Sequence, residues 1–221
     1  MRSATSLMIL ILLGWAISQP TLTPVTHAQS TVVATSTFDT DAEGWTTDGD
    51  ASCRPTPCYA ATGGNPGGHI NTGDGLQGVK FYFNAPAKFL GDASAAYGGE
   101  LTFDMRQNVR SINETNDVDV ILVGAGLTLV YDTPRNPPTI WFTYDVPLVE
   151  TAGWRKGSLA GPAPSTAEMQ AVLSSLTRLG LRGDFVFGQG TSYLDNVVLG
   201  GPEVPLVVIS EVFLPLVRVT R

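Results

Sequence analysis

Apolar and polar residues alternate with a period of two along much of the chain, which is typical of half-buried β-strands. Residues 79–84 and 101–106 carry apolar side chains at odd positions and polar side chains at nearly all even ones. The apolar run ending at residue 123, the glycine turn at 124–126 and residues 127–131 together predict a hairpin. The same reasoning predicts further strands at 31–38, 140–146, 179–187 and 194–199.

One segment has helical spacing instead. Ser165 and Glu168 match a capping box, in which each side chain satisfies the other residue's free backbone N–H. Apolar residues then follow at 169, 172, 173, 176 and 179, and Gly180 ends the run. Many short strands, separated by glycine and proline clusters, together with a single helix predict an all-β fold. The expected architecture is an antiparallel β-sandwich or jelly roll with one short covering helix.

The two ends of the chain differ in composition from its middle. Arg2 followed by an apolar stretch and Ala28 predicts a secretory signal peptide at 1–28, with an uncleaved anchor as the alternative. The domain is expected at 29–200, and residues 201–221 are interpreted as a linker and an apolar tail. The short length of this tail, interrupted by Glu211, argues against a membrane span. A sorting tag, a peripheral anchor and an edge strand all stay open for it.

The net charge of the chain limits the classes of partner that it is expected to bind. The chain has 13 basic and 20 acidic residues, a net charge of −7, and removal of Arg2 with the leader makes it more negative. Such a balance excludes a nucleic acid partner, since no basic stripe is present to neutralise phosphates. It also argues against an anionic membrane surface. We therefore expect a secreted or cell-surface protein with no stable membrane span after signal cleavage.

Cys53 and Cys58 are the two cysteines of the chain. In an oxidising compartment such close cysteines are expected to form a local disulfide. A metal site is the alternative, but two thiolates do not complete a tetrahedral zinc shell.

Catalytic motifs are missing from the sequence. Outside the predicted leader the only histidine is His69, and no Gly-x-Ser-x-Gly motif surrounds a serine. These observations argue against an enzyme. A secreted glycoside-active enzyme with two converging carboxylates is the less favoured alternative.

Several motifs in a fixed order resemble the laminin B (type IV) domain. They comprise FNAPAKFLGD at 83–92, AYGGELTF at 96–103, VILVGAGL at 120–127, Trp141, Trp154-Arg155, the capped helix, Arg182-Gly183 and LDNVVL at 194–199. The resemblance covers residues 36–200. It implies an extracellular, non-catalytic binding or adhesion module, with a purely structural or protein-binding surface module as the alternative.

A second, looser resemblance is to galactose-binding-like carbohydrate-binding modules. It rests on FDTDAEGW at 38–45 and on the closing strand 194–199. In that superfamily, acidic residues of these two segments often bind a structural calcium ion. Carried over by position, the resemblance implies Asp39 and Asp195 as ligands, with Asp41 as an extra one. The alternative is that Asp39 and Asp41 are turn residues, and that Asp195 accepts hydrogen bonds from loop amides.

Carbohydrate sites combine exposed aromatic side chains with polar groups, because sugar rings have apolar faces and polar rims. Candidate ligand-binding residues on the polar strand faces are Tyr82, Asp104, Arg106 and Arg182. The large side chains of Trp45, Trp141 and Trp154 are expected in the core. The predicted partner is an extracellular glycan or a matrix or surface protein.

Overall fold

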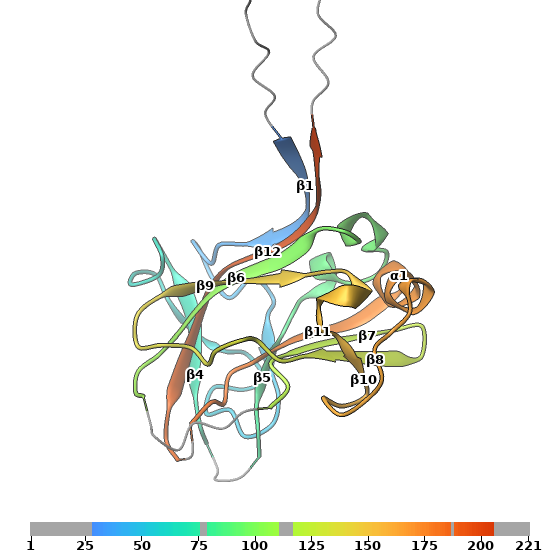
Figure 1. Ribbon diagram of the computed structural model, residues 1–221. Helices are drawn as coiled ribbons and strands as arrows, with labels where there is room; N and C mark the ends of the chain where they lie inside the picture. The colour runs from blue at the N-terminus through green and yellow to red at the C-terminus, as the bar shows by residue number, and fades with distance from the viewer. Residues whose placement is uncertain (1–27, 76–78, 111–116, 187, 206–221) are drawn as a thin grey trace, which may run out of the picture. The chain divides into compact units, whose positions relative to one another are not determined.

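The computed structural model describes residues 28–75, 79–110, 117–186 and 188–205, which form two antiparallel sheets packed face to face (Figure 1). The predicted β-sandwich with one short helix is therefore confirmed. Sheet A has the strand order β3 (Cys58–Ala60), β4 (His69–Gly73), β12 (Thr191–Pro205), β6 (Glu100–Gln107) and β9 (Phe142–Pro147). Strand β1 (Ala28–Ser36) also pairs with β12.

Sheet B covers the other side of the core. Its order is β10 (Arg155–Lys156), β8 (Leu127–Tyr131), β7 (Val120–Gly124), β11 (Leu176–Arg182), β5 (Tyr82–Asn84) and β2 (Thr46–Thr47). The predicted hairpin is β7 and β8. Three single-turn 3₁₀ helices connect the strands: η1 (Ala87–Phe89), η2 (Ser94–Ala96) and η3 (Glu150–Ala152).

Apolar residues from both sheets form one core, to which two tryptophans contribute. Trp45 and Trp154 are fully buried, as predicted. Their indole N–H groups donate to Ser36 Oγ at 2.9 Å and to the Pro147 carbonyl at 2.8 Å. The prediction that Trp141 also lies in the core is wrong, because this residue is partly exposed on the outer side of sheet A.

Strand β12 organises sheet A. One of its edges pairs with β6, and its other edge pairs first with β4 and then with β1. A register shift between Asp195 and Val198 marks a bulge, where Asn196 adopts a left-handed backbone conformation with φ of 47°. The strand continues through residues 201–205, within the range 201–221 for which the sequence predicts a linker and an apolar tail. Pairing with β1 explains this difference, since it supplies partners for the backbone of those residues.

The helix is shorter than its spacing predicts. The capping box is present, but α1 (Thr166–Ser174) ends before Leu176, and Leu176 and Leu179 belong to β11. The hydroxyls of Ser174 and Ser175 both donate to the Ala171 carbonyl and so compete with the helical backbone. In the part of the chain that the structure describes, no helix has the length and apolarity needed to cross a membrane.

Other strand boundaries also differ from the sequence prediction. Sheet B uses only Tyr82–Asn84 of the predicted strand at 79–84, and the strand predicted at 179–187 ends at Arg182. Strands β2, β3, β4 and β10 have two to five residues each and were not predicted. The predicted disulfide between Cys53 and Cys58 is confirmed, and it closes the loop before β3.

Candidate functional site

The side of sheet A that faces away from the core presents polar residues and aromatic rings. In β6, Leu101, Phe103 and Met105 are buried in the core, so the alternating residues at 100, 102, 104 and 106 lie on the opposite side. We call this side, with the corresponding residues of β9 and β12, outer face A. It carries two of the four ligand-binding residues predicted from the sequence, Asp104 and Arg106.

Arg106 lies against two aromatic rings at one end of outer face A. It pairs in register with Tyr193 of β12, and its guanidinium carbon lies 3.7 Å from the centre of the Tyr193 ring. The same carbon lies 5.1 Å from the centre of the Trp141 ring, just before β9. These distances are those of cation–π contacts. With His69, these residues form what we call the arginine–aromatic cluster.

His69 joins the cluster from the edge of β4. Its ring is 5.8 Å from that of Trp141 and 5.5 Å from that of Tyr193. The His69 side chain is buried, and burial together with the positive charge of Arg106 lowers its pKa below the usual value. His69 is therefore neutral at pH 7. Trp141 is fixed further by its indole N–H, which donates to the Gly63 carbonyl at 3.1 Å.

Two aspartates under the loop of residues 63–68 occupy the middle of outer face A. Asp104 accepts hydrogen bonds from the Thr143 hydroxyl at 2.6 Å, the Asn65 amide at 3.0 Å and the Asn196 amide at 2.8 Å. Asp195 accepts the backbone N–H groups of Asn65 at 2.6 Å and Asn196 at 2.7 Å. The bulge in β12 places Asn196 where it can join this network. Neutral donors therefore satisfy both carboxylates.

Glycine allows the loop to lie this close to the sheet. A Cβ atom at Gly64 would stand 2.5 Å from Asp195 Oδ2, and one at Gly67 would stand 2.8 Å from Asp39 Oδ1. Burial, followed by the charges of Asp104 and Asp39, raises the pKa of Asp195 to about 6. The loop thus buries negative charge that no ion pair of Asp195 offsets within the described residues.

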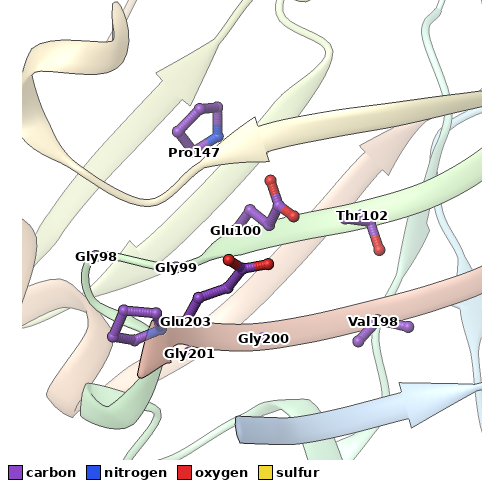
Figure 2. Close-up of a pocket in the computed structure, with 10 residues that line it drawn as sticks. Gly98, Gly99, Glu100, Thr102, Pro147, Val198, Gly200, Gly201 and Glu203 are labelled. Carbon is purple, nitrogen blue, oxygen red and sulfur yellow. The ribbon is translucent and has the colours of Figure 1, made fainter. Parts of the chain in front are cut away.

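A groove of about 530 Å³ lies at the other end of outer face A. Figure 2 shows Glu100 of β6 and Glu203 of β12 extending their carboxylates toward it. Its lining is glycine-rich and consists of Gly98, Gly99, Glu100, Thr102, Pro147, Val198, Gly200, Gly201, Pro202 and Glu203. Outer face A is therefore acidic at the groove and carries a cation at the arginine–aromatic cluster.

The other two predicted ligand-binding residues lie in sheet B, away from this face. Tyr82 is only partly exposed, and its hydroxyl donates to the Val118 carbonyl at 3.0 Å. Arg182 is fully buried, where its guanidinium lies 3.4 Å from the carboxylate of Asp119. The structure therefore does not bring the four predicted residues together, and Arg182 is inaccessible to a ligand.

The structure also fails to bring all three predicted calcium ligands together. Asp39 Oδ1 and Asp195 Oδ2 both approach the loop of residues 63–68, whereas Asp41 accepts the N–H of Glu43 at 2.6 Å within its own turn. Within the described ranges, no group of three histidine, cysteine or acidic side chains is arranged to hold a metal ion. A calcium ion between Asp39 and Asp195 would need backbone carbonyls and water as further ligands. The site stays a prediction.

Sequence reasoning did not select Tyr193, Asn65, Asn196 or His69 as site residues. Tyr193 had a usable signal, because it alternates with the buried Leu194 and shares the face of Asp195. The contributions of Asn65 and His69 depend on where one loop folds. No local sequence pattern predicts where that loop lies.

Comparison with known proteins identifies sequence relatives of this chain. A family model for "Laminin B (Domain IV)" matches residues 82–202. Laminin subunit gamma-1 of Xenopus tropicalis is 30% identical over 187 residues, which are 80% of this chain and 11% of that protein. Laminin subunit gamma-2 of Equus caballus is 37% identical over 125 residues, 53% of this chain and 10% of that protein. The chain thus spans about a tenth of the length of these relatives.

Among solved structures, a family 11 carbohydrate-binding module of a cellulosomal cellulase of Clostridium thermocellum shares the fold. It superimposes with a TM-score of 0.50 and 11% identity, covering 80% of this chain and 98% of the module. At this identity the likeness concerns the fold alone. The family model, in contrast, matches more than half of the sequence, so the chain belongs to the laminin B (domain IV) family.

Proposed function

We propose that this chain is an extracellular, non-catalytic module that binds carbohydrate on outer face A. One observation carries the proposal: Arg106 of β6, Tyr193 of β12 and Trp141 just before β9 lie side by side. Aromatic rings stack on the apolar face of a sugar ring, and adjacent polar groups bind its hydroxyls. The cluster offers both kinds of group on a rigid sheet.

The extent of outer face A favours an oligosaccharide over a single sugar. From Glu100 to Arg106 the strand β6 covers roughly 20 Å, at about 3.4 Å per residue. Polar side chains that can bind hydroxyls continue along the face at Thr102 and at the exposed Thr143 and Asp145 of the adjacent β9. The groove at Glu100 and Glu203 extends the same face. A chain of sugars therefore has polar partners beyond the cluster.

Family and fold support this proposal without deciding it. The relatives are laminin subunits, and the apolar residues near the start of the chain support export through a signal peptide. The likeness to the carbohydrate-binding module of Clostridium thermocellum supports a scaffold on which such a site can be built. Sequestration of Asp104 and Asp195 by loop donors supports a binding role over a catalytic one.

The direct test is a glycan array with the purified protein, followed by titration calorimetry on any glycan that binds. We expect saturable binding that Tyr193→Ala and Trp141→Ala each weaken at least about tenfold, as aromatic residues dominate binding surfaces. Tyr82→Ala in sheet B serves as the control and should leave affinity unchanged.

Melting temperatures of all three variants separate lost binding from lost folding. If Tyr82→Ala weakens binding as much as Tyr193→Ala, outer face A is the wrong site. If no glycan binds, carbohydrate recognition is refuted, and the structural or protein-binding module becomes the better hypothesis.

A further inference from the structure

Among the described residues, none accepts a hydrogen bond from the Arg106 guanidinium. No carboxylate of these residues lies within 4.0 Å of it. Its nearest acidic neighbour along β6 is Asp104, whose oxygens are engaged by Thr143, Asn65 and Asn196. The charge of Arg106 therefore stands unpaired beside occupied carboxylates.

Two aromatic rings lie against the guanidinium of Arg106. Arg106 is partly buried, with Tyr193 at 3.7 Å and Trp141 at 5.1 Å from its central carbon. The 3.7 Å distance to Tyr193 is that of a guanidinium stacked flat on the ring, an arrangement that leaves the N–H edge free. That edge is a planar fork of donors that matches the two oxygens of a carboxylate or a similar oxyanion. The cluster orders the arginine before any ligand arrives.

Local electrostatics agree with this geometry. Burial and then the positive charge of Arg106 lower the pKa of the neighbouring His69. His69 itself adds no charge at pH 7. In a protein of net charge −7, Arg106 thus places a positive charge on the same face as the acidic groove of Glu100 and Glu203.

We propose that outer face A recognises an anionic glycan, with Arg106 binding a carboxylate or sulfate group of a sugar that stacks on Trp141 and Tyr193. This inference rests on the proposed carbohydrate binding and adds the ligand class. The shared chemistry is an oxyanion carried by a sugar ring. Uronic acids and sulfated sugars are its two sources, and the acidic groove disfavours an oligosaccharide charged along its whole length.

The test compares matched ligands by calorimetry in 0.15 M NaCl. They are an oligosaccharide containing uronic acid, the same oligosaccharide with its carboxyl groups reduced to alcohols, and a sulfated form of the reduced one. We expect at least one anionic form to bind at least about tenfold tighter than the neutral form. Raising the salt concentration should weaken only that preference.

Two variants assign the preference to Arg106. Arg106→Gln should abolish the difference between charged and neutral ligands, and Arg106→Lys should restore part of it, because a lysine keeps the charge but loses the fork. Arg178→Gln is the matched control, since Arg178 also lies over a tyrosine ring but is paired with Asp48. It should leave the preference intact.

The outcomes are distinguishable. Equal affinity for charged and neutral forms would overturn the anionic class while leaving carbohydrate binding in place. A preference that survives in Arg106→Gln would overturn the role of Arg106. Failure of all three ligands and of the wider array would refute both the proposed function and this inference.

Discussion

The outer sides of the two sheets each place an arginine over a tyrosine ring, but they treat it differently. In sheet B, Arg178 lies 5.5 Å from the ring centre of Tyr82 and donates to Asn84 and to Asp48, each at 2.8 Å. In sheet A, Arg106 lies over Tyr193 with no acceptor among the described residues. Hydrogen bonds within the protein therefore engage the donors of Arg178, whereas those of Arg106 are available to a ligand.

The carboxylates follow the same division. Asp48 in sheet B is paired with Arg178, whereas Asp104 and Asp195 in sheet A accept hydrogen bonds from neutral groups. Outer face A thus keeps its cation and its buried acids apart. A charge that is paired within the protein links two of its segments. A charge without an ion-pair partner among the described residues can still bind a ligand. The comparison therefore distinguishes residues of the scaffold from residues of a binding surface.

The largest expected effect comes from the arginine that is most fully enclosed. Arg182→Met should lower the free energy of unfolding by about 3–5 kcal/mol, because it leaves the buried Asp119 carboxylate without its cation. Chemical denaturation measures this loss. The double variant Arg182→Met with Asp119→Leu should recover much of it. A single variant as stable as the wild type would show that the pair is not structural.

The next effect concerns Asp195 of sheet A, whose carboxylate accepts hydrogen bonds from neutral groups. The pKa of Asp195 is raised to about 6 in the folded state, above its unfolded value, so the folded protein binds more protons between these values. The contribution of this group to stability therefore rises as pH falls from 7 to 5. In Asp195→Asn this dependence should be lost, measured as the melting temperature from pH 5 to 7.5. The exposed Asp145→Asn should retain the wild-type profile.

A smaller effect should separate the two arginines directly. Arg178→Gln should cost about 1 kcal/mol of stability, because a partly exposed ion pair contributes little. Arg106→Gln should cost less than Arg178→Gln, since it loses only its contacts with aromatic rings and breaks no hydrogen bond within the described residues. Urea denaturation of both variants tests this contrast. Equal losses would remove the distinction between the two arginines.

The last prediction tests the calcium site that we propose at Asp39 and Asp195. A site of extracellular affinity should add less than about 1.5 kcal/mol of stability at 1 mM calcium. A chelator should therefore lower the melting temperature slightly, and Asp39→Asn should remove that response. Asp41→Asn is the control, because Asp41 bonds within its own turn. An unchanged melting temperature would refute calcium binding here.

Sequence reasoning was most successful where a pattern acts locally. Alternation in β6 identified both the core face of Leu101 and the outer face of Arg106, because successive strand residues point to opposite sides. The capping box at Ser165 and Glu168 located the start of α1. It failed at the helix end, since Leu176 satisfies a helical period and a strand period alike. Pairing with Gly124 of β7 decides between them.

The candidate site was predicted only in part, for a similar reason. Alternation placed Tyr82 and Arg106 on polar faces but gave no indication that these faces belong to different sheets. Trp141 was expected in the core because of its size, yet it borders a face where Arg106 and Tyr193 provide its contacts. Burial of a large ring depends on its neighbours across the sheet.

By itself, the sequence determined the all-β class, the capped helix, the local disulfide and the order of motifs typical of the laminin B family. Each depends on residues close together in the chain. The tertiary structure decided that Arg178 is paired with Asp48 and that Arg106 has no acceptor among the described residues. Arg106 meets Tyr193 only because β6 and β12 lie side by side, and Asp104 is occupied only because the loop of residues 63–68 folds over it. Such contacts join residues far apart in sequence, where no local spacing rule applies.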